Sequence, residues 1–119
     1  MPDFSKSERR LLRDLAADVY EAEAHLLLEA LDASFAEWRE DRILSSELIG
    51  RIHEFHQDDS RPLWSMYRGL KEHDIVARGI ARDLLRADKV RPELLEKLRP
   101  LIADYVRGWG GDSNESSMA

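Results

Sequence analysis

Apolar residues recur along most of the chain at the three- and four-residue spacing of an α-helix, and no stretch shows the sustained alternation of a half-buried strand. The longest such pattern begins after Ser5 or Ser7 and runs to about Glu40. Its apolar residues form two stripes. The first comprises Leu12, Leu15, Val19, Ala22, Leu26 and Ala30, and the second continues it around the helix with Leu27, Leu31, Phe35 and Trp38. At about 1.5 Å per residue the helix would be about 50 Å long, so we expect part of it to serve a second subunit.

Prolines and turn-forming residues divide the rest of the chain into shorter helices. One helix is expected to start with Ser45 as its N-cap, and Leu44 and Ile49 are expected to pack together there as a hydrophobic staple. Because proline cannot donate a backbone hydrogen bond, Pro62 predicts a break over Asp58–Pro62 and a short helix after it.

Two further helices complete the predicted fold. One covers about residues 73–87, and the other covers residues 92–107 with a kink or split at Pro100. We therefore predict that residues 1–109 form an all-α, single-domain bundle of four to five helices, of which the N-terminal helix is long. A flexible polar C-terminal tail is expected over residues 110–119.

The composition excludes several classes of site. Cysteine is absent, which excludes disulfides, thiolate zinc sites, iron–sulfur clusters and cysteine nucleophiles, so any metal would need His, Asp and Glu ligands. The longest aliphatic run is the three leucines at 26–28, far short of the roughly 20 apolar residues that a membrane span needs. The N-terminal segment lacks the apolar stretch of a signal peptide, so we expect a cytoplasmic, bacterial protein.

The segment RIHEFHQDDSRPLW, residues 51–64, holds two of the four histidines of the chain. On a helical wheel His56 falls in an apolar arc with Ile52 and Phe55, whereas His53 lies at its edge. The spacing of the two histidines differs from the His-Glu-x-x-His motif of zinc proteases. We therefore interpret His56 first as a core or interface residue.

A metal site is the alternative interpretation. Glu23 lies on the apolar stripe of the first helix, where a carboxylate needs a histidine, an arginine or a hydroxyl as its partner, or a place near an edge. If the helices converge, one polar pocket would be lined by Glu23, His56, Asp59 and His73. Such a pocket would bind a divalent metal such as Zn²⁺, Mn²⁺ or Fe²⁺, or supply the acid–base groups of a hydrolase. The Glu-x-x-His, phosphate-loop and serine-hydrolase motifs are absent from the sequence.

Charge is unevenly distributed in this acidic protein, whose formal net charge is −6. An acidic ridge follows the first helix and comprises Asp14, Asp18, Glu21, His25, Glu29 and Asp32. A basic ridge on the helix at 73–87 comprises Arg78, Arg82 and Arg86. The simplest interpretation is that both ridges are faces exposed to solvent. The second is that the two ridges pair with each other. Nucleic-acid binding by the basic ridge comes last, because acidic residues lie beside it.

A candidate partner-binding patch follows Pro62. Trp64 and Tyr67 lie three residues apart there, and the patch is completed by Arg61 and Arg68. Aromatic and arginine side chains are the residue types enriched at the energetic centres of protein interfaces. We expect at least one of the two rings to belong to the core instead.

These patterns favour a binding function over catalysis. We expect a homo-oligomeric binding or accessory module, most simply a homodimer, whose partner is itself or another protein and which uses neither a cofactor nor a membrane. The association surface would be the apolar stripe of the first helix or the edge formed by Leu101, Tyr105 and Trp109. The alternatives are the metal-binding hydrolase described above and, third, a weak nucleic-acid-binding regulator that uses the basic ridge.

Overall fold

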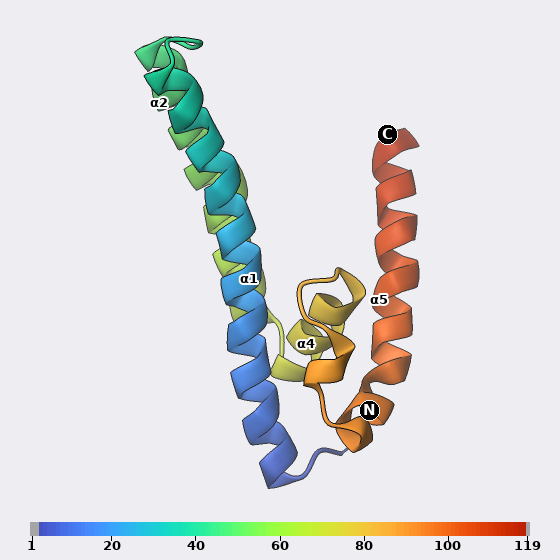
Figure 1. Cartoon of the computed structure of the whole chain (residues 1–119). Coiled ribbons are helices and arrows are strands. Elements are labelled where there is room, and N and C mark those ends of the chain that lie inside the picture. The colour runs from blue at the N-terminus through green and yellow to red at the C-terminus, as the bar shows by residue number, and fades with distance from the viewer. Residues whose placement is uncertain (1–2, 119) are drawn as a thin grey trace. The chain divides into compact units, whose positions relative to one another are not determined.

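Residues 3–118 are described by the computed structural model, with side chains for residues 3–108, and they form helices joined by short loops without any strand (Figure 1). This confirms the predicted all-α fold. The chain divides into two compact units: a core unit that contains the residues up to Val19 and those from Leu70 onward, and a hairpin unit, Tyr20–Gly69. The long helix α1, Lys6–Arg39, contributes to both units and confirms the predicted long N-terminal helix.

The core unit is built from the first half of α1, the helix α4 (Glu72–Ala81), a 3₁₀ turn at Ala87–Lys89 and the helix α5 (Pro92–Met118). Its buried apolar side chains are Leu12, Leu15, Ala16, Val19, Ile75, Val76, Ala77, Val90, Leu94 and Leu98. On α1 and α5 they repeat every three or four residues, so each helix turns one stripe inward. Packing is closest at Gly79, where an added Cβ would lie 2.7 Å from both methyl carbons of Val19.

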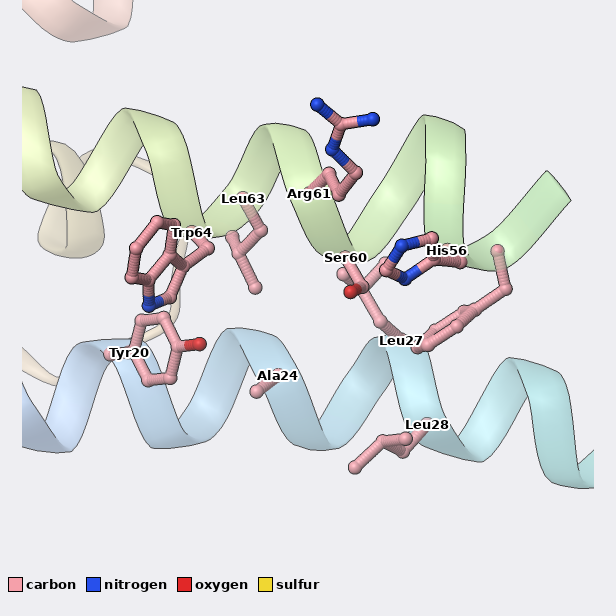
Figure 2. Close-up of a pocket in the computed structure, with 10 residues that line it drawn as sticks. Tyr20, Ala24, Leu27, Leu28, His56, Ser60, Arg61, Leu63 and Trp64 are labelled. Atoms are coloured by element: carbon pink, nitrogen blue, oxygen red, sulfur yellow. The ribbon is translucent and has the colours of Figure 1, made fainter. Parts of the chain in front are cut away.

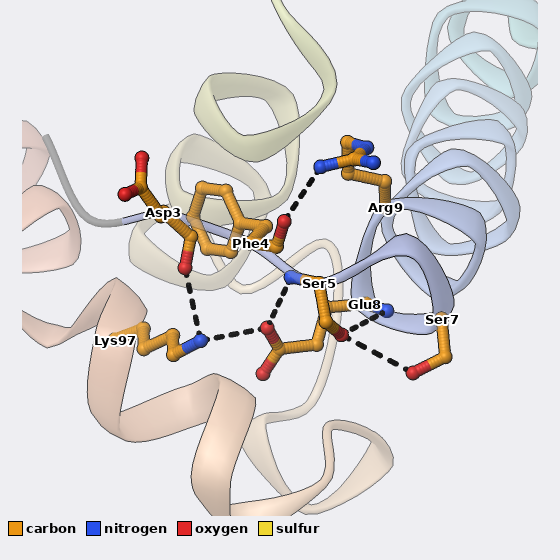
Figure 3. Close-up of polar contacts among 7 residues, drawn as sticks. All are labelled: Asp3, Phe4, Ser5, Ser7, Glu8, Arg9 and Lys97. Atoms are coloured by element: carbon orange, nitrogen blue, oxygen red, sulfur yellow. Dashed lines mark hydrogen bonds and ion pairs between the residues drawn. The ribbon is translucent and has the colours of Figure 1, made fainter.

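A capping box starts α1 and ties it to α5 (Figure 3). The Ser5 hydroxyl accepts a hydrogen bond from the backbone N–H of Glu8 at 3.1 Å, and the Glu8 carboxylate accepts one from the backbone N–H of Ser5 at 2.8 Å. Lys97 of α5 donates to the same carboxylate at 2.7 Å and to the backbone carbonyl of Asp3 at 3.0 Å. Two of these bonds converge on Oε1 of Glu8, whose side chain is buried.

The hairpin unit consists of the second half of α1 and a returning helical segment, which comprises α2 (Ser45–Glu54), a π-helix (Phe55–Ser60) and α3 (Arg61–Gly69). The turn between them starts at Asp41, whose φ of 58° is left-handed. The backbone N–H groups of Asp41 and Arg42 donate to the carbonyls of Trp38 and Glu37, which is the Schellman pattern of helix termination.

The start of α2 differs from the prediction. Leu44, not Ser45, is the N-cap, and no side chain caps the helix. The Ser45 hydroxyl instead accepts a hydrogen bond from the Trp38 indole N–H at 3.0 Å. The predicted staple is also wrong, because Leu44 and Ile49 are 75% and 66% exposed.

The predicted break over Asp58–Pro62 is wrong as well, since the chain stays helical from Ser45 to Gly69. In the π-helical segment the backbone N–H of Arg61 donates to the carbonyl of His56, five residues earlier. In an ordinary α-helix the ring of Pro62 would collide with the carbonyl of Asp58, four residues before it. The wider π turn relieves this collision, so Pro62 widens the helix without ending it.

The helix predicted over residues 73–87 ends early, at Ala81. Asp83 adopts a left-handed φ of 60°, and a second Schellman pattern follows, in which Leu84 donates to the carbonyl of Gly79 at 2.8 Å and Asp83 to that of Ile80 at 3.1 Å. The basic ridge therefore does not lie on one helix. Arg78 lies within α4, Arg82 is its C-cap, and Arg86 lies beyond its end.

α5 continues through Pro100 and extends to Met118, so of the predicted kink or split the split is absent and the kink stays a prediction. α5 thus runs through most of the segment predicted as a tail at 110–119, and the flexibility of that tail stays a prediction. Within the described part of the chain, no helix combines the length and the hydropathy that crossing a membrane requires.

Candidate binding face of the helical hairpin

A pocket of about 410 Å³ lies between the two arms of the hairpin unit (Figure 2). We call it the hairpin pocket. From α1 it is lined by Tyr20, Ala24, Leu27 and Leu28, and from the returning segment by Phe55, His56, Ser60, Arg61, Leu63 and Trp64. Seven of these ten side chains are aliphatic or aromatic, so the pocket offers mainly carbon atoms to an occupant, with polar groups contributed by the π-helical segment.

Large apolar side chains around the hairpin pocket are exposed to solvent. Leu28 is 55% exposed and Trp64 is 54% exposed. Ile52 and Ile49 lie four and seven residues before His56, so they continue the same side of the returning segment, and they are 38% and 66% exposed. We call these four residues the apolar face. Grouped exposed apolar side chains of this size typically mark an interaction site, whereas single ones are ordinary.

Two charged edges border the apolar face. Glu21 and Asp32 of α1 lie seven residues before and four residues after Leu28, and both are exposed. Across the pocket, Arg61 and Arg68 lie three residues before and four residues after Trp64, and both are exposed too. The hairpin unit therefore has an acidic edge on α1 and a basic edge on α3.

The buried carboxylate of Glu23 joins the two arms next to the pocket. The Tyr67 hydroxyl donates a hydrogen bond to it at 2.7 Å, and the Tyr67 ring meets the Tyr20 ring edge-on, with 4.9 Å between centroids. This confirms the expectation that Glu23 needs a hydroxyl, a histidine or an arginine as its partner. A satisfied buried hydrogen bond of this kind fixes how α1 and α3 pack.

A second polar cluster joins the arms near the turn of the hairpin. Arg51 donates to the carboxylates of Glu37 at 2.6 Å and Glu47 at 2.9 Å and to the hydroxyl of Ser34 at 3.2 Å. The hydrogen bonds to Glu37 and then Glu47 raise the pKa of Arg51 above its ordinary value. This cluster was not predicted from the sequence, although the four-residue spacing of Glu47 and Arg51 is a recognisable signal for half of it.

The four residues predicted to form a metal site belong to two units: Glu23, His56 and Asp59 to the hairpin unit, and His73 to the core unit. Glu23 is bonded to Tyr67, and both His56 and Asp59 are exposed. His73 belongs to the core unit, where it stacks on Phe4 with 5.4 Å between ring centroids. Among the residues with described side chains, no three His, Asp or Glu residues gather at a point that could hold a metal ion.

The arc on which His56 was predicted is only partly buried, because Ile52 on the same arc is 38% exposed and Phe55 is half-buried. His56 accordingly lies at the exposed rim of the hairpin pocket, and it is not a core residue.

The predicted partner-binding patch is divided between two roles. Arg61 and Trp64 line the hairpin pocket, and Arg68 lies over the Trp64 ring at 4.5 Å from its centroid. Tyr67 is directed inward to Glu23, which agrees with the expectation that one of the two rings belongs to the core. In the basic ridge, Arg86 forms an ion pair with Asp88 at 2.6 Å.

Comparison with known proteins adds no assignment to this geometry. No protein family matches the chain, and no similar curated protein and no similar solved structure is found.

Proposed function

We propose that this protein is a self-association module whose two copies join through the apolar faces of their hairpin units. The observation that supports the proposal is the exposure of Leu28, Ile49, Ile52 and Trp64, between 38% and 66%, around a pocket lined mainly by carbon atoms. Covering these side chains would contribute on the order of 25 cal/mol for each Å² removed from water, less the entropy lost on association.

Charge favours a second copy as the occupant. With a two-fold axis parallel to the helices, α1 of one copy faces the returning segment of its partner, and the acidic edge of each copy lies beside the basic edge of the other. With a two-fold axis across the helices, α1 faces α1 and the two acidic edges repel each other. Because one surface carries both an acidic and a basic edge, charge favours the dimer whose two-fold axis is parallel to the helices.

The mass in solution tests this proposal. Sedimentation equilibrium is expected to give a mass near twice 13.8 kDa for the unmodified chain at tens of micromolar. Leu28→Asp is expected to weaken the dimer by about 100-fold or more, because it introduces a carboxylate into the covered face.

Leu26→Asp is the matched control. Leu26 is 56% exposed on the same helix but does not line the hairpin pocket, so its change to aspartate is expected to leave the dimer intact. Far-UV circular dichroism verifies that both variants keep their helical content. A strictly monomeric unmodified chain, or equal dissociation by Leu26→Asp and Leu28→Asp, would contradict the proposal.

A further inference from the structure

The first two turns of α1 carry a cluster of cations that the hairpin unit does not involve. Lys6, Arg9, Arg10 and Arg13 are all exposed, within a protein whose net charge is −6. Cations at a helix N-terminus face the positive end of the helix dipole, so they reduce helix stability. The stability of α1 therefore does not account for their presence.

These cations are largely without partners inside the molecule. Arg9 donates to the backbone carbonyl of Phe4 at 2.6 Å (Figure 3). Among the residues with described side chains, Lys6, Arg10 and Arg13 form neither a hydrogen bond nor an ion pair. Their charge is available to a ligand.

Two neighbouring hollows of the core unit share Arg13. One, of about 330 Å³, is lined by Arg9, Arg13, Lys71 and His73 together with Asp3, Phe4, Leu12 and Glu72. The other, of about 570 Å³, is lined by Lys6, Ser7, Arg10 and Arg13, with no acidic residue. Taken together, the two hollows hold five permanent cations and two carboxylates, so their combined field attracts anions.

The first hollow also includes the start of α4. Lys71 is the N-cap of this ten-residue helix, and no side chain caps it, so the backbone N–H groups of its first turn are open to an acceptor. The imidazole Nε2 of His73 is buried and lies 3.5 Å from the carboxylate of Asp74.

We propose that the two hollows form one binding site for a small ligand that carries two or more linked phosphates. Arginine presents a planar fork of donors that fits phosphate oxygens, and three of the five cations are arginines. Lys6 and Arg13, which both line the second hollow, lie about 10 Å apart along the helix axis, so even this hollow is longer than one phosphate group. Linked phosphates engage both hollows at once, with Arg13 between them.

Isothermal titration of the full chain with orthophosphate, pyrophosphate and tripolyphosphate tests the site. Affinity is expected to rise along this series, and tripolyphosphate is expected to bind about tenfold or more tightly than orthophosphate, because it reaches both hollows. Arg13→Gln, which removes the cation shared by the hollows, is expected to weaken tripolyphosphate binding by about tenfold.

Arg39→Gln is the charge-matched control, because Arg39 is an exposed arginine of the same helix that lies in the hairpin unit. It is expected to leave the affinity for tripolyphosphate unchanged. An equal loss in both variants, or no binding of tripolyphosphate, would overturn the proposal. So would a single-stranded oligonucleotide that binds and is not displaced by tripolyphosphate. Leu28→Asp is expected to bind tripolyphosphate normally, which separates this test from that of the dimer.

Discussion

Gly79 shows how one residue sets the packing of the core unit. An added Cβ there would lie 2.7 Å from two methyl carbons of the buried Val19, so the valine side chain or one of the two helices must shift. We predict that Gly79→Ala destabilises the protein by about 1–3 kcal/mol, the range typical of overpacked cores. Urea denaturation followed by circular dichroism measures the change.

Gly50→Ala is the matched substitution for Gly79→Ala. Gly50 lies in the interior of α2, and no atom lies within 4 Å of its added Cβ. The same methyl group is therefore expected to stabilise the protein there by about 0.5–1 kcal/mol, because alanine loses less backbone entropy in a helix. Destabilisation of similar size at both positions would show that close packing at Gly79 is not the cause.

At the scale of elements, the capping box at the start of α1 predicts a dependence of stability on pH. The hydrogen bond from Lys97, then the one from the Ser5 backbone, lowers the pKa of Glu8 below its ordinary value of 4.5. A lowered folded-state pKa means that the unfolded chain binds more protons as the pH falls below 4.5. The contribution of Glu8 is therefore complete above that pH and is lost as the pH falls through the folded-state pKa.

Glu8→Gln tests this dependence, because it keeps a side chain compatible with the capping box but removes the charge that Lys97 contacts. The variant is expected to be less stable than the unmodified chain at pH 7, and the difference is expected to shrink once the pH falls below 4.5. Urea denaturation across this pH range measures it. Glu96→Gln, at an exposed pair with Arg99, is expected to change little at any pH.

The same scale shows what the sequence could predict. The long apolar stripe of α1 placed that helix correctly, with a start after Ser5 or Ser7 and an end near Glu40, because periodicity acts within one segment. The π-helix could not be predicted, since Pro62 is equally compatible with a break. Nor could the end of α4, because Asp83 adopts a left-handed conformation for which glycine is the usual signal.

At the scale of the whole molecule, the candidate site was predicted in part. Arg61 and Trp64 were identified from residue type and spacing, because interface residues have a distinctive composition. Leu28 was missed because it lies outside both apolar stripes of α1, although a run of three leucines already shows that apolar residues extend beyond one face. The interpretation of His56 as a core residue was wrong, because it lies at the exposed rim of the pocket, and its interpretation as an interface residue stays a prediction.

The two charged edges of the hairpin unit give the last prediction. Reversing the acidic edge with Glu21→Arg and Asp32→Arg produces a chain with two basic edges, and reversing the basic edge with Arg61→Asp and Arg68→Asp produces one with two acidic edges. In the proposed two-fold arrangement each edge meets the opposite edge of the partner, so both variants are expected to lose self-association through repulsion.

Mixing the two variants brings each basic edge against an acidic one, so a heterodimer is expected to form where neither homodimer does. Native mass spectrometry distinguishes these species when one chain is isotopically labelled. The arrangement with α1 facing α1 predicts the same result for this mixture, because there too each variant repels itself and the mixed pair brings opposite charges together. The two arrangements differ in the unmodified dimer, which added salt is expected to weaken if acidic edges meet basic ones and to strengthen if acidic edges meet acidic ones. Loss of association in both variants without a heterodimer would show that charge does not select this arrangement. The heterodimer should weaken with added salt, since exposed pairs are screened beyond a Debye length of about 10 Å at 0.1 M.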